Sequence, residues 1–243
     1  ETCMITSLQN ETIKEIVKLK QKKYRDEKKM FLIEGFHLIE EARKKHSILQ
    51  IITTLSDDFE EETLHVSQNV MNKLAFTRSP QPIMAICRQN NHSLIVEDGQ
   101  RYLLLDRVQD PGNVGTMMRT ALAFGYDQMI MSEDCVDLYN DKVIRATQGA
   151  LFQMNVCVMN LKDAIVFLKH QGVDVYGTCL RDASSIETYQ VKDKMAFVMG
   201  NEGQGVCDEI LELCQHRLYI PIQTVESLNV GIASAITMYH FQK

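Results

Sequence analysis

The sequence predicts an α/β protein of two domains, the second built on a parallel β-sheet. The 243 residues exceed the usual size of one domain, and 45% of them are hydrophobic, which is enough for a packed interior. Short apolar runs typical of strands alternate with segments of helical periodicity. The polar stretch 89–100 contains Asp98-Gly99, which has turn chemistry, and we expect the domain boundary there.

The first domain is predicted as a small α/β module over residues 1–90, followed by a linker at 91–100. Leu38, Ile39 and Ala42 recur at helical spacing, and Ser67 can cap a later helix. The expected elements are a basic helix ending near Lys23, strand Met30–Ile33, helix Gly35–Lys45, strand Ile48–Thr53, helix Val66–Leu74 and strand Ile83–Cys87.

The second domain is predicted over residues 101–243. Strands are expected at 102–105, 128–131, 155–159, 174–178, 195–199 and 218–220, and helices at 114–124, 142–147, 161–170, 208–213 and 228–241. This alternation predicts a parallel sheet covered on both faces. Ligands of such sheets lie at the carboxyl ends of the strands. Three loops there, at 106–119, 200–206 and 221–229, carry most of the informative side chains.

Composition narrows the function classes. No stretch approaches the roughly 18 consecutive apolar residues that cross a bilayer, and residues 1–10 lack a signal pattern, so we expect a cytoplasmic protein without a membrane partner. The seven cysteines form no CxxC pair and no zinc-ligand spacing, so we expect no metal site and a reducing compartment. The net charge of −6 argues against a protein that coats nucleic acid indiscriminately.

One basic segment opposes this overall charge. Residues 14–29 hold eight basic and three acidic side chains, which leaves five positive charges. Such a confined patch indicates a nucleic-acid contact, and a solvated helix face is the alternative.

The first loop leaves the apolar strand Leu103–Leu105 and contains Pro111-Gly112-Asn113. We expect Asn113 to cap the following helix. Arg119 then lies nearly two turns further on, and its long side chain can return along the helix toward the loop. A turn followed by a surface arginine is the alternative interpretation.

The second loop, Gly200–Gly205, has glycines that let backbone amides approach a ligand. Its GxxGxG spacing is neither the GxGxxG of dinucleotide binding nor a phosphate loop. The third loop leads into a helix with small residues at Gly231 and 233–235, which permit close approach of another backbone.

Together the loops resemble one family. DPGNVGTMMRTALAFG, FVMGNEGQGV and IPIQTVESLNVGIASAI are similar, in order and spacing, to the three signatures of SpoU (TrmH-type) RNA ribose 2'-O-methyltransferases of the SPOUT superfamily. The segment Lys142–Ala150 is also similar to the family. Lys23-Tyr24-Arg25, Phe31–Gly35 and Ser79-Pro80-Gln81 resemble its ribosomal-protein-like substrate-binding domain, so the resemblance covers nearly the whole chain.

The resemblance implies a SPOUT catalytic domain with a deep C-terminal trefoil knot, which periodicity cannot reveal. It also implies S-adenosylmethionine as the methyl donor, RNA as a partner, and a homodimer with active sites at its interface. By motif position, the expected catalytic residues are Asn113, Arg119, Glu202, Ser227 and Asn229. The expected cofactor-binding residues are Gly200, Ile220, Leu228, Thr178 and Asn229, and the expected RNA-binding residues are Lys22, Lys23, Arg25, Arg119 and Arg145.

The family assigns removal of the ribose hydroxyl proton to the arginine at position 119. Because a guanidinium normally stays protonated, Arg119 could instead bind phosphate and stabilise the developing alkoxide, with phosphate or water accepting the proton. We expect Glu202 to order its loop by an ion pair or by accepting backbone N–H bonds. The third signature is one residue shorter than the common form and lacks its glycine, at Gln223–Val225.

The resemblance of the first domain to ribosomal proteins favours large-subunit (23S) ribosomal RNA as the substrate, and transfer RNA is the alternative. Two other classes compete with a methyltransferase. The glycine spacing disfavours a nucleotide-binding oxidoreductase. The joint presence of all five expected catalytic residues disfavours an RNA-binding assembly factor that has lost chemistry.

Overall fold

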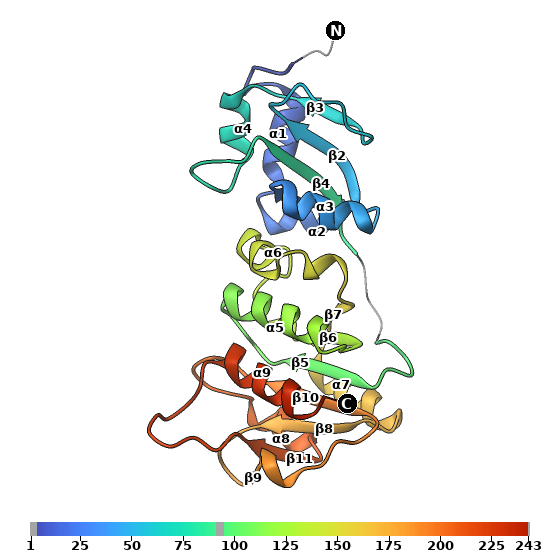
Figure 1. Ribbon diagram of the computed structural model, residues 1–243, viewed down its shortest axis with the longest axis vertical. Helices are drawn as coiled ribbons and strands as arrows, with labels where there is room; N and C mark the ends of the chain where they lie inside the picture. The colour runs from blue at the N-terminus through green and yellow to red at the C-terminus, as the bar shows by residue number, and fades with distance from the viewer. Residues whose placement is uncertain (1–3, 91–94, 243) are drawn as a thin grey trace. The chain divides into compact units, whose positions relative to one another are not determined.

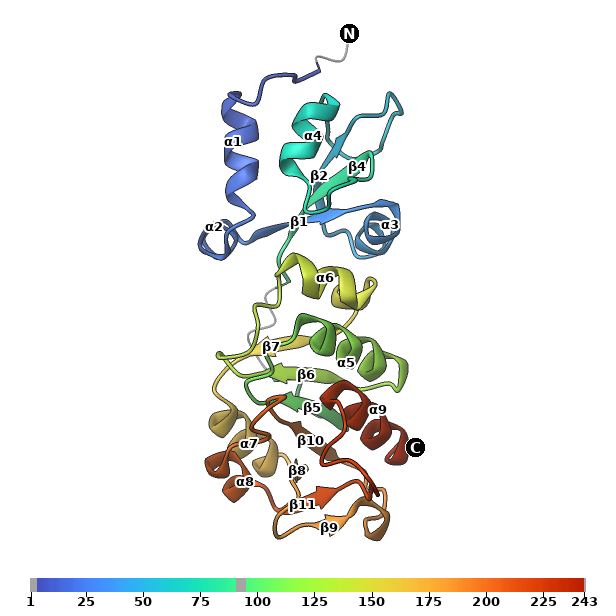
Figure 2. The same ribbon diagram turned by 90° about the vertical axis from the view of Figure 1, so that its left-hand side faces the viewer.

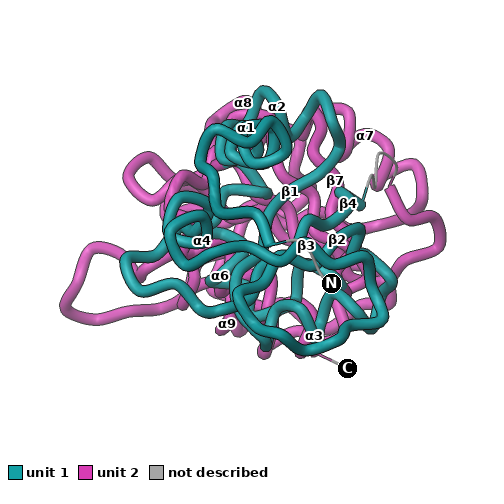
Figure 3. Tube along the Cα trace, turned by 90° about the horizontal axis from the view of Figure 1, so that it is seen from above, with its two compact units in different colours: residues 1–90, 137–152 teal, residues 91–136, 153–243 magenta. Residues whose placement is uncertain are grey.

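The computed structural model describes residues 4–90 and 95–242, whose helices and strands are labelled in Figure 1. The chain forms two compact units (Figure 3): residues up to 90 with 137–152 make unit 1, and residues 91–136 with 153 onward make unit 2. The segment Asp137–Phe152 therefore groups with unit 1, although its place in the sequence lies within the predicted second domain. Residues 91–94 of the expected linker lie outside the described residues.

Unit 1 is built on a mixed sheet with the strand order β1-β4-β2-β3. Its strands are β1 (Met30–Glu34), β2 (Ile48–Thr53), β3 (Thr63–His65) and β4 (Ile83–Arg88). β4 pairs antiparallel with β1 and β2, and β3 runs parallel to β2. Strand β3 was not expected from the sequence, because three residues are too few to show an alternating pattern.

Helices α1 (Glu11–Lys18) and α4 (Gln68–Leu74) bury one face against this sheet, with Ile13 and Leu74 in the shared core. The side chain of Ser67 accepts the N–H of Val70, which confirms the predicted cap of α4. The predicted single basic helix is wrong in one respect. The chain turns after Lys18 and starts a second helix, α2 (Lys22–Lys28).

The segment Asp137–Phe152 supplies side chains to the core of unit 1. It contains α6 (Asp141–Thr147) and the 3₁₀ turn η1 (Ala150–Phe152), and helix α3 (Phe36–Lys44) also belongs to this unit. The ring of Phe31 on β1 lies 4.6 Å from that of Tyr139 and 6.1 Å from that of Phe152. This aromatic packing explains why the segment groups with unit 1.

Arg25 joins α2 to the same segment. Its side chain is buried, donates to the carbonyl oxygens of Leu19 and Lys20, and pairs with Asp137 Oδ2 at 2.5 Å. Gln89 Nε2 donates to the Arg25 carbonyl. The predicted RNA contact at Arg25 is therefore wrong, because this guanidinium is enclosed by protein and already bound.

Replacing Arg25 with alanine should lower the free energy of unfolding by on the order of 3 kcal/mol, because Asp137 loses its partner in a largely buried place. Urea denaturation measures this change. Lys23→Ala, on the exposed side of the same helix, is the matched control and should change stability by less than about 0.5 kcal/mol. Equal, small changes in the two variants would contradict a structural role for Arg25.

Unit 2 is built on a seven-stranded sheet in which every pairing is parallel, as predicted. The strand order is β7-β6-β5-β10-β8-β11-β9. The strands are β5 (Arg101–Leu105), β6 (Gln128–Met131), β7 (Val156–Val158), β8 (Asp174–Thr178), β9 (Ser184–Ser185), β10 (Met195–Met199) and β11 (His216–Tyr219). Strand β9, which has two residues, and the turn η2 (Ile186–Thr188) after it were not expected from the sequence.

Helices cover both faces of this sheet. Figure 2 shows α5 (Pro111–Ala123) and α9 (Val230–His240) on one side and α7 (Leu161–His170) and α8 (Asp208–Leu213) on the other. Leu104 and Val198 pack in the core with α7 and α8, while Phe197 on the opposite face stacks on Phe241, with ring centroids 4.8 Å apart. Within the described residues, no helix is long and apolar enough to cross a membrane.

Candidate functional site

The strand order of unit 2 reverses between β5 and β10. From β5 the chain proceeds outward through β6 to β7, and it later returns to the other side of β5. Loops at the carboxyl ends of β5 and β10 therefore diverge from adjacent strands, and such a switch point forms a crevice in parallel sheets. The loops 106–110 and 200–206, identified from the sequence, both begin there.

Asp110, and not Asn113, caps α5. The Asp110 side chain accepts the N–H of Asn113 at 2.8 Å, and the helix starts at Pro111, which has no N–H to satisfy. The prediction that Asn113 caps this helix is wrong, because Asn113 lies within the first turn. Its side-chain amide is consequently free to bond to other loops.

The Asn113 amide joins three loops. Its Nδ2 donates to Glu202 Oε1 in the second loop at 3.2 Å, and its Oδ1 accepts from Asn229 Nδ2 in the third loop at 3.0 Å. Asn229 Oδ1 accepts the N–H groups of Gly231 and Ile232 and so caps α9. Asn113 is only 8% exposed, and a buried amide needs hydrogen-bond partners at both its nitrogen and its oxygen. The contacts with Glu202 and Asn229 supply them.

Glu202 orders its loop by accepting N–H bonds, the second of the two expected ways. Besides Asn113, its carboxylate accepts the N–H of Asp110 at 2.9 Å and that of Gln109 at 3.2 Å. Burial raises the pKa of the Glu202 carboxyl, but these hydrogen bonds outweigh burial and hold the pKa below the ordinary value. The carboxylate is thus ionised at neutral pH, and its contacts are lost only as the pH falls below the ordinary carboxyl range.

Gly200 is required by a close approach of backbone. A Cβ atom there would lie 2.1 Å from the carbonyl carbon of Gly205 and 2.1 Å from the nitrogen of Val206. The chain folds back through paired hydrogen bonds between Asn201 and Gly205. In the third loop, no residue between 221 and 229 has a positive φ, so this loop forms without the glycine of the common family signature.

A cavity of about 890 Å³ opens between these loops within unit 2. All five residues expected to bind a cofactor line it: Thr178, Gly200, Ile220, Leu228 and Asn229. Its size suits a nucleoside-sized ligand. Among the described residues, the backbone N–H groups of Ile222 and Leu228 have no hydrogen-bond partner, so they can serve a ligand. These features fit S-adenosylmethionine.

A smaller hollow lies beside the cavity. It is lined by Gln109, Asp110, Pro111, Asn113, Glu202 and Asn229. Asn229 lines both spaces, and Ser227 lines only the larger one. Arg119 is exposed on α5 and lines neither space. The structure thus brings four of the five expected catalytic residues to the cavity or hollow and leaves Arg119 outside their walls.

Three of the expected RNA-binding residues are exposed on unit 1. Lys22 pairs with Asp26, the ammonium of Lys23 lies 5.7 Å from the centre of the Tyr24 ring, and Arg145 on α6 pairs with Asp141. Exposed pairs of this kind are weak and can exchange for phosphate.

Asp106, Arg107 and Asn201 were not among the residues expected from the sequence, yet they form a hydrogen-bond network between the first two loops. The sequence did indicate Asp106 and Arg107, because these charged residues directly follow an apolar strand at the ligand-binding edge of a parallel sheet. Of the cysteines, the six in the described residues are free thiols, and Cys3 lies outside them.

The sequence and fold of this chain are similar to those of known proteins. Residues 100–239 match the SpoU rRNA Methylase family, and residues 10–85 match the MRM3-like substrate binding domain. The chain belongs to the SpoU rRNA methylase family. As a SpoU methylase it is an RNA methyltransferase, and S-adenosylmethionine is its methyl donor.

Individual relatives match nearly the full length of this SpoU methylase. The 23S rRNA (guanosine(2553)-2'-O)-methyltransferase RlmP of Bacillus subtilis is 37% identical over 98% of both chains. The structure of an AdoMet-bound rRNA methyltransferase from Sinorhizobium meliloti is 29% identical, with a TM-score of 0.88, and the match covers 98% of this chain and 96% of that one. The SpoU methyltransferase AviRb from Streptomyces viridochromogenes, at 19% identity and a TM-score of 0.86 over 96% and 97% of the two chains, shows the same fold.

Asn113→Asp should reduce methyl transfer at about pH 7 by at least about 10²-fold, because the new carboxylate repels Glu202 and cannot donate to it. Two adjacent carboxylates share a proton more readily as the pH falls, so the activity relative to wild type should rise toward about pH 5. Methyl-transfer rates across this range measure the effect. Asn113→Ala, which adds no titratable group, should show no such rise, and a flat ratio for both variants would refute the contact.

Proposed function

We propose that this chain methylates a ribose 2'-hydroxyl of large-subunit ribosomal RNA. The observation that carries the proposal is the Asn113 amide, which joins the cavity that fits the donor to a polar hollow that can receive a ribose. The full-length similarity to a 23S ribosomal RNA 2'-O-methyltransferase supports this substrate. Transfer RNA is the alternative substrate, and a cytoplasmic location stays a prediction.

The cofactor would be held by the loops at the carboxyl ends of β10 and β11. Gly200, Ile220 and Leu228 would contact it mainly through backbone groups, and the Thr178 hydroxyl, which donates to the Val198 carbonyl at 2.8 Å, fixes the neighbouring wall. When bound, S-adenosylmethionine supplies an electrophilic methyl group. In-line transfer requires the ribose oxygen to be held next to that group, and this is the task of the polar hollow.

Glu202 does not act as the base in this proposal. Its carboxylate accepts three N–H groups and has a lowered pKa, so it is a weak proton acceptor. The Arg119 guanidinium, which lies outside the walls of the hollow, would bind a backbone phosphate of the RNA next to the ribose and stabilise the alkoxide that develops there. The proton passes to that phosphate or to water. Ser227 and Asn229 hold the third loop at the start of α9.

Unit 1 would bind the RNA through its exposed cations. Lys22 and Lys23 on α2 and Arg145 on α6 belong to this unit, and the match of residues 10–85 to a substrate-binding domain supports the role. Because only a few cations contact the RNA, the binding is confined to a small part of the protein surface, and its affinity depends only moderately on the salt concentration.

We also propose that the C-terminal part of unit 2 is knotted. Three observations support the proposal: β11 is separated from β5 by β8 and β10, α9 nevertheless packs against α5, and Arg101 at the start of β5 donates to the carbonyl of Phe241 at 3.3 Å. The chain between β11 and α9 therefore returns across two strands. Small residues at Gly231 and Ser234 permit the close packing that this path needs.

A homodimer would use the outer face of α9. Ile232, Ile236 and Tyr239 are 52%, 39% and 63% exposed, and their spacing places them on one face of the helix. Exposed apolar side chains in one row are typical of a protein contact. A second copy on this face would cover them.

Methylation assays on purified RNA test the substrate. The wild-type protein with a tritiated donor should label ribosomal RNA of the large subunit and leave transfer RNA unlabelled, and the label should survive alkaline hydrolysis in a dinucleotide, because a 2'-O-methyl group blocks cleavage. Label in transfer RNA alone, or label on a base, would contradict the proposal.

Arg119→Ala should reduce turnover by about 10²-fold or more, because the cation that stabilises the reacting oxygen is lost. The affinity for S-adenosylmethionine should stay within about twofold, since Arg119 does not line the cavity. Calorimetry and the tritium assay measure the two quantities. Arg119→Lys, which keeps the charge, should retain part of the activity, and loss of cofactor binding in the alanine variant would refute the assignment.

Charge reversal at Lys22 and Lys23 should weaken RNA binding and reduce the slope of log affinity against log salt by about 0.7 to 0.9 for each phosphate contact that is lost. Filter binding at several salt concentrations measures this slope. Reversal at Lys44, which pairs with Glu41 elsewhere on unit 1, is the control. An unchanged slope would show that Lys22 and Lys23 on α2 do not contact the RNA and belong to a solvated helix face.

A further inference from the structure

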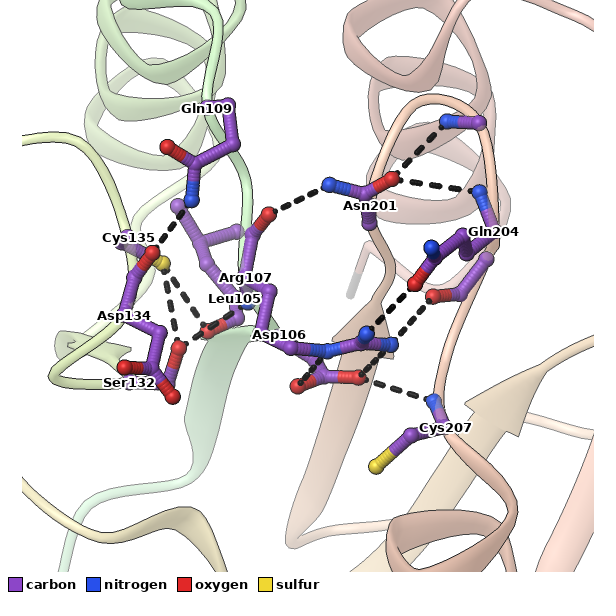
Figure 4. A network of polar contacts seen from close by, with 12 residues as sticks. Leu105, Asp106, Arg107, Gln109, Ser132, Asp134, Cys135, Asn201, Gln204 and Cys207 are labelled. Atoms are coloured by element: carbon purple, nitrogen blue, oxygen red, sulfur yellow. Dashed lines mark hydrogen bonds and ion pairs between the residues drawn. The ribbon is translucent and has the colours of Figure 1, made fainter.

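Two charged residues, Asp106 and Arg107, directly follow β5 and have no role in the proposed methyl transfer. Asp106 is 3% exposed, and its carboxylate pairs with the guanidinium of the next residue, Arg107, with Nε 3.2 Å from Oδ1 and Nη2 3.3 Å from Oδ2. The Arg107 side chain is partly exposed, whereas the buried Asp106 carboxylate needs partners that offset its loss of water. Figure 4 shows that both side chains turn toward the second loop.

Arg107 and Asp106 bind the far end of that loop. Arg107 Nη1 donates to Gln204 Oε1 at 2.8 Å, and Nη2 donates to the carbonyl of Gly205 at 3.2 Å. Asp106 Oδ2 accepts the N–H of Cys207 at 2.8 Å (Figure 4). The ion pair thus holds the stretch from Gln204 to Cys207 through three hydrogen bonds, and charge-assisted bonds of this type are the stronger ones.

The backbone of Arg107 binds the near end of the same loop. Its carbonyl accepts Asn201 Nδ2 at 2.8 Å, and Asn201 Oδ1 in turn accepts the N–H groups of Gly203 and Gln204. Arg107 has a φ of 56°, a left-handed conformation that is uncommon for a residue with a side chain. Its N–H donates to Ser132 Oγ at 2.9 Å, which stabilises this conformation.

The loop is therefore held at both ends by one residue. These contacts together hold the segment 201–207. Gly200 lies just before this segment and lines the cavity, and Glu202 lies within it and binds the Asn113 amide. A shift of the loop would move the backbone at Gly200 and withdraw the Glu202 carboxylate together.

We propose that Asp106 and Arg107 are positioning residues that set the glycine-rich loop for cofactor binding and catalysis. This inference rests on the proposed function, because it assigns the pair a part in the same site. Asp106 does not line the cavity and acts through Arg107 and Cys207. Arg107 lines the cavity itself, and it also positions the loop through its hydrogen bonds to Gln204, Gly205 and Asn201.

Arg107→Ala, Arg107→Lys and Arg43→Ala test the proposal. Arg107→Ala should weaken the affinity for S-adenosylmethionine about tenfold and raise its KM to match, since loss of one or two charge-assisted hydrogen bonds corresponds to such a factor. Its kcat should also fall, because Glu202 is displaced. Arg107→Lys, which keeps one donor toward the loop, should recover part of both losses. Arg43 pairs with Glu61 in unit 1 and supplies the matched control, with unchanged KM and kcat.

The split between KM and kcat distinguishes positioning from mere stability. A variant that only unfolds in part loses active molecules, so its kcat falls while its KM for the donor stays the same. If Arg107→Ala does not fold, Gln204→Ala removes one Arg107 contact from an exposed loop and should still raise the KM several-fold. A wild-type KM in both variants would overturn the inference, whereas failure of the wild-type protein to bind the donor would overturn the proposed function instead.

Discussion

The site depends on one buried amide that is a donor at one end and an acceptor at the other. Asn113 donates to Glu202 and accepts from Asn229, so the first loop holds the second and third through a single side chain. Neither a carboxylate nor an alkyl group can make both bonds, because a carboxylate lacks the donor and an alkyl group lacks both the donor and the acceptor. Since Asn113 is buried, leaving either end unpaired would also carry a desolvation penalty.

The fold brings the three loops within reach of this amide. Adjacent parallel strands β5 and β10 end at the same edge, and α9 packs against α5, which places the start of α9 beside the first turn of α5. The donor cavity and the polar hollow then share Asn229 as a common wall. A binding space for a methyl donor and a binding space for a sugar can thus be aligned by hydrogen bonds within one unit.

Periodicity predicted every strand of more than three residues and, apart from α2, every α-helix within a few residues, because each buries an apolar face. The loops were found because they follow buried strands. The hydrogen bonds of the loops could not be predicted in the same way. Asp110, and not Asn113, caps α5, and Arg25 pairs with Asp137, which lies over a hundred positions away in the chain. The Arg107 contacts to residues 201–205 also join residues that are far apart in the sequence, and no local pattern predicts such pairings.

A crystal structure of the protein with S-adenosylmethionine would show whether the Asn113 amide aligns the two binding spaces. We expect the donor in the cavity lined by Gly200, Ile220 and Leu228, with its methyl group directed toward the hollow and the Asn113 bonds to Glu202 and Asn229 intact. A donor bound elsewhere on the chain, or one bound in the cavity with Asn113 released from both partners, would contradict this expectation.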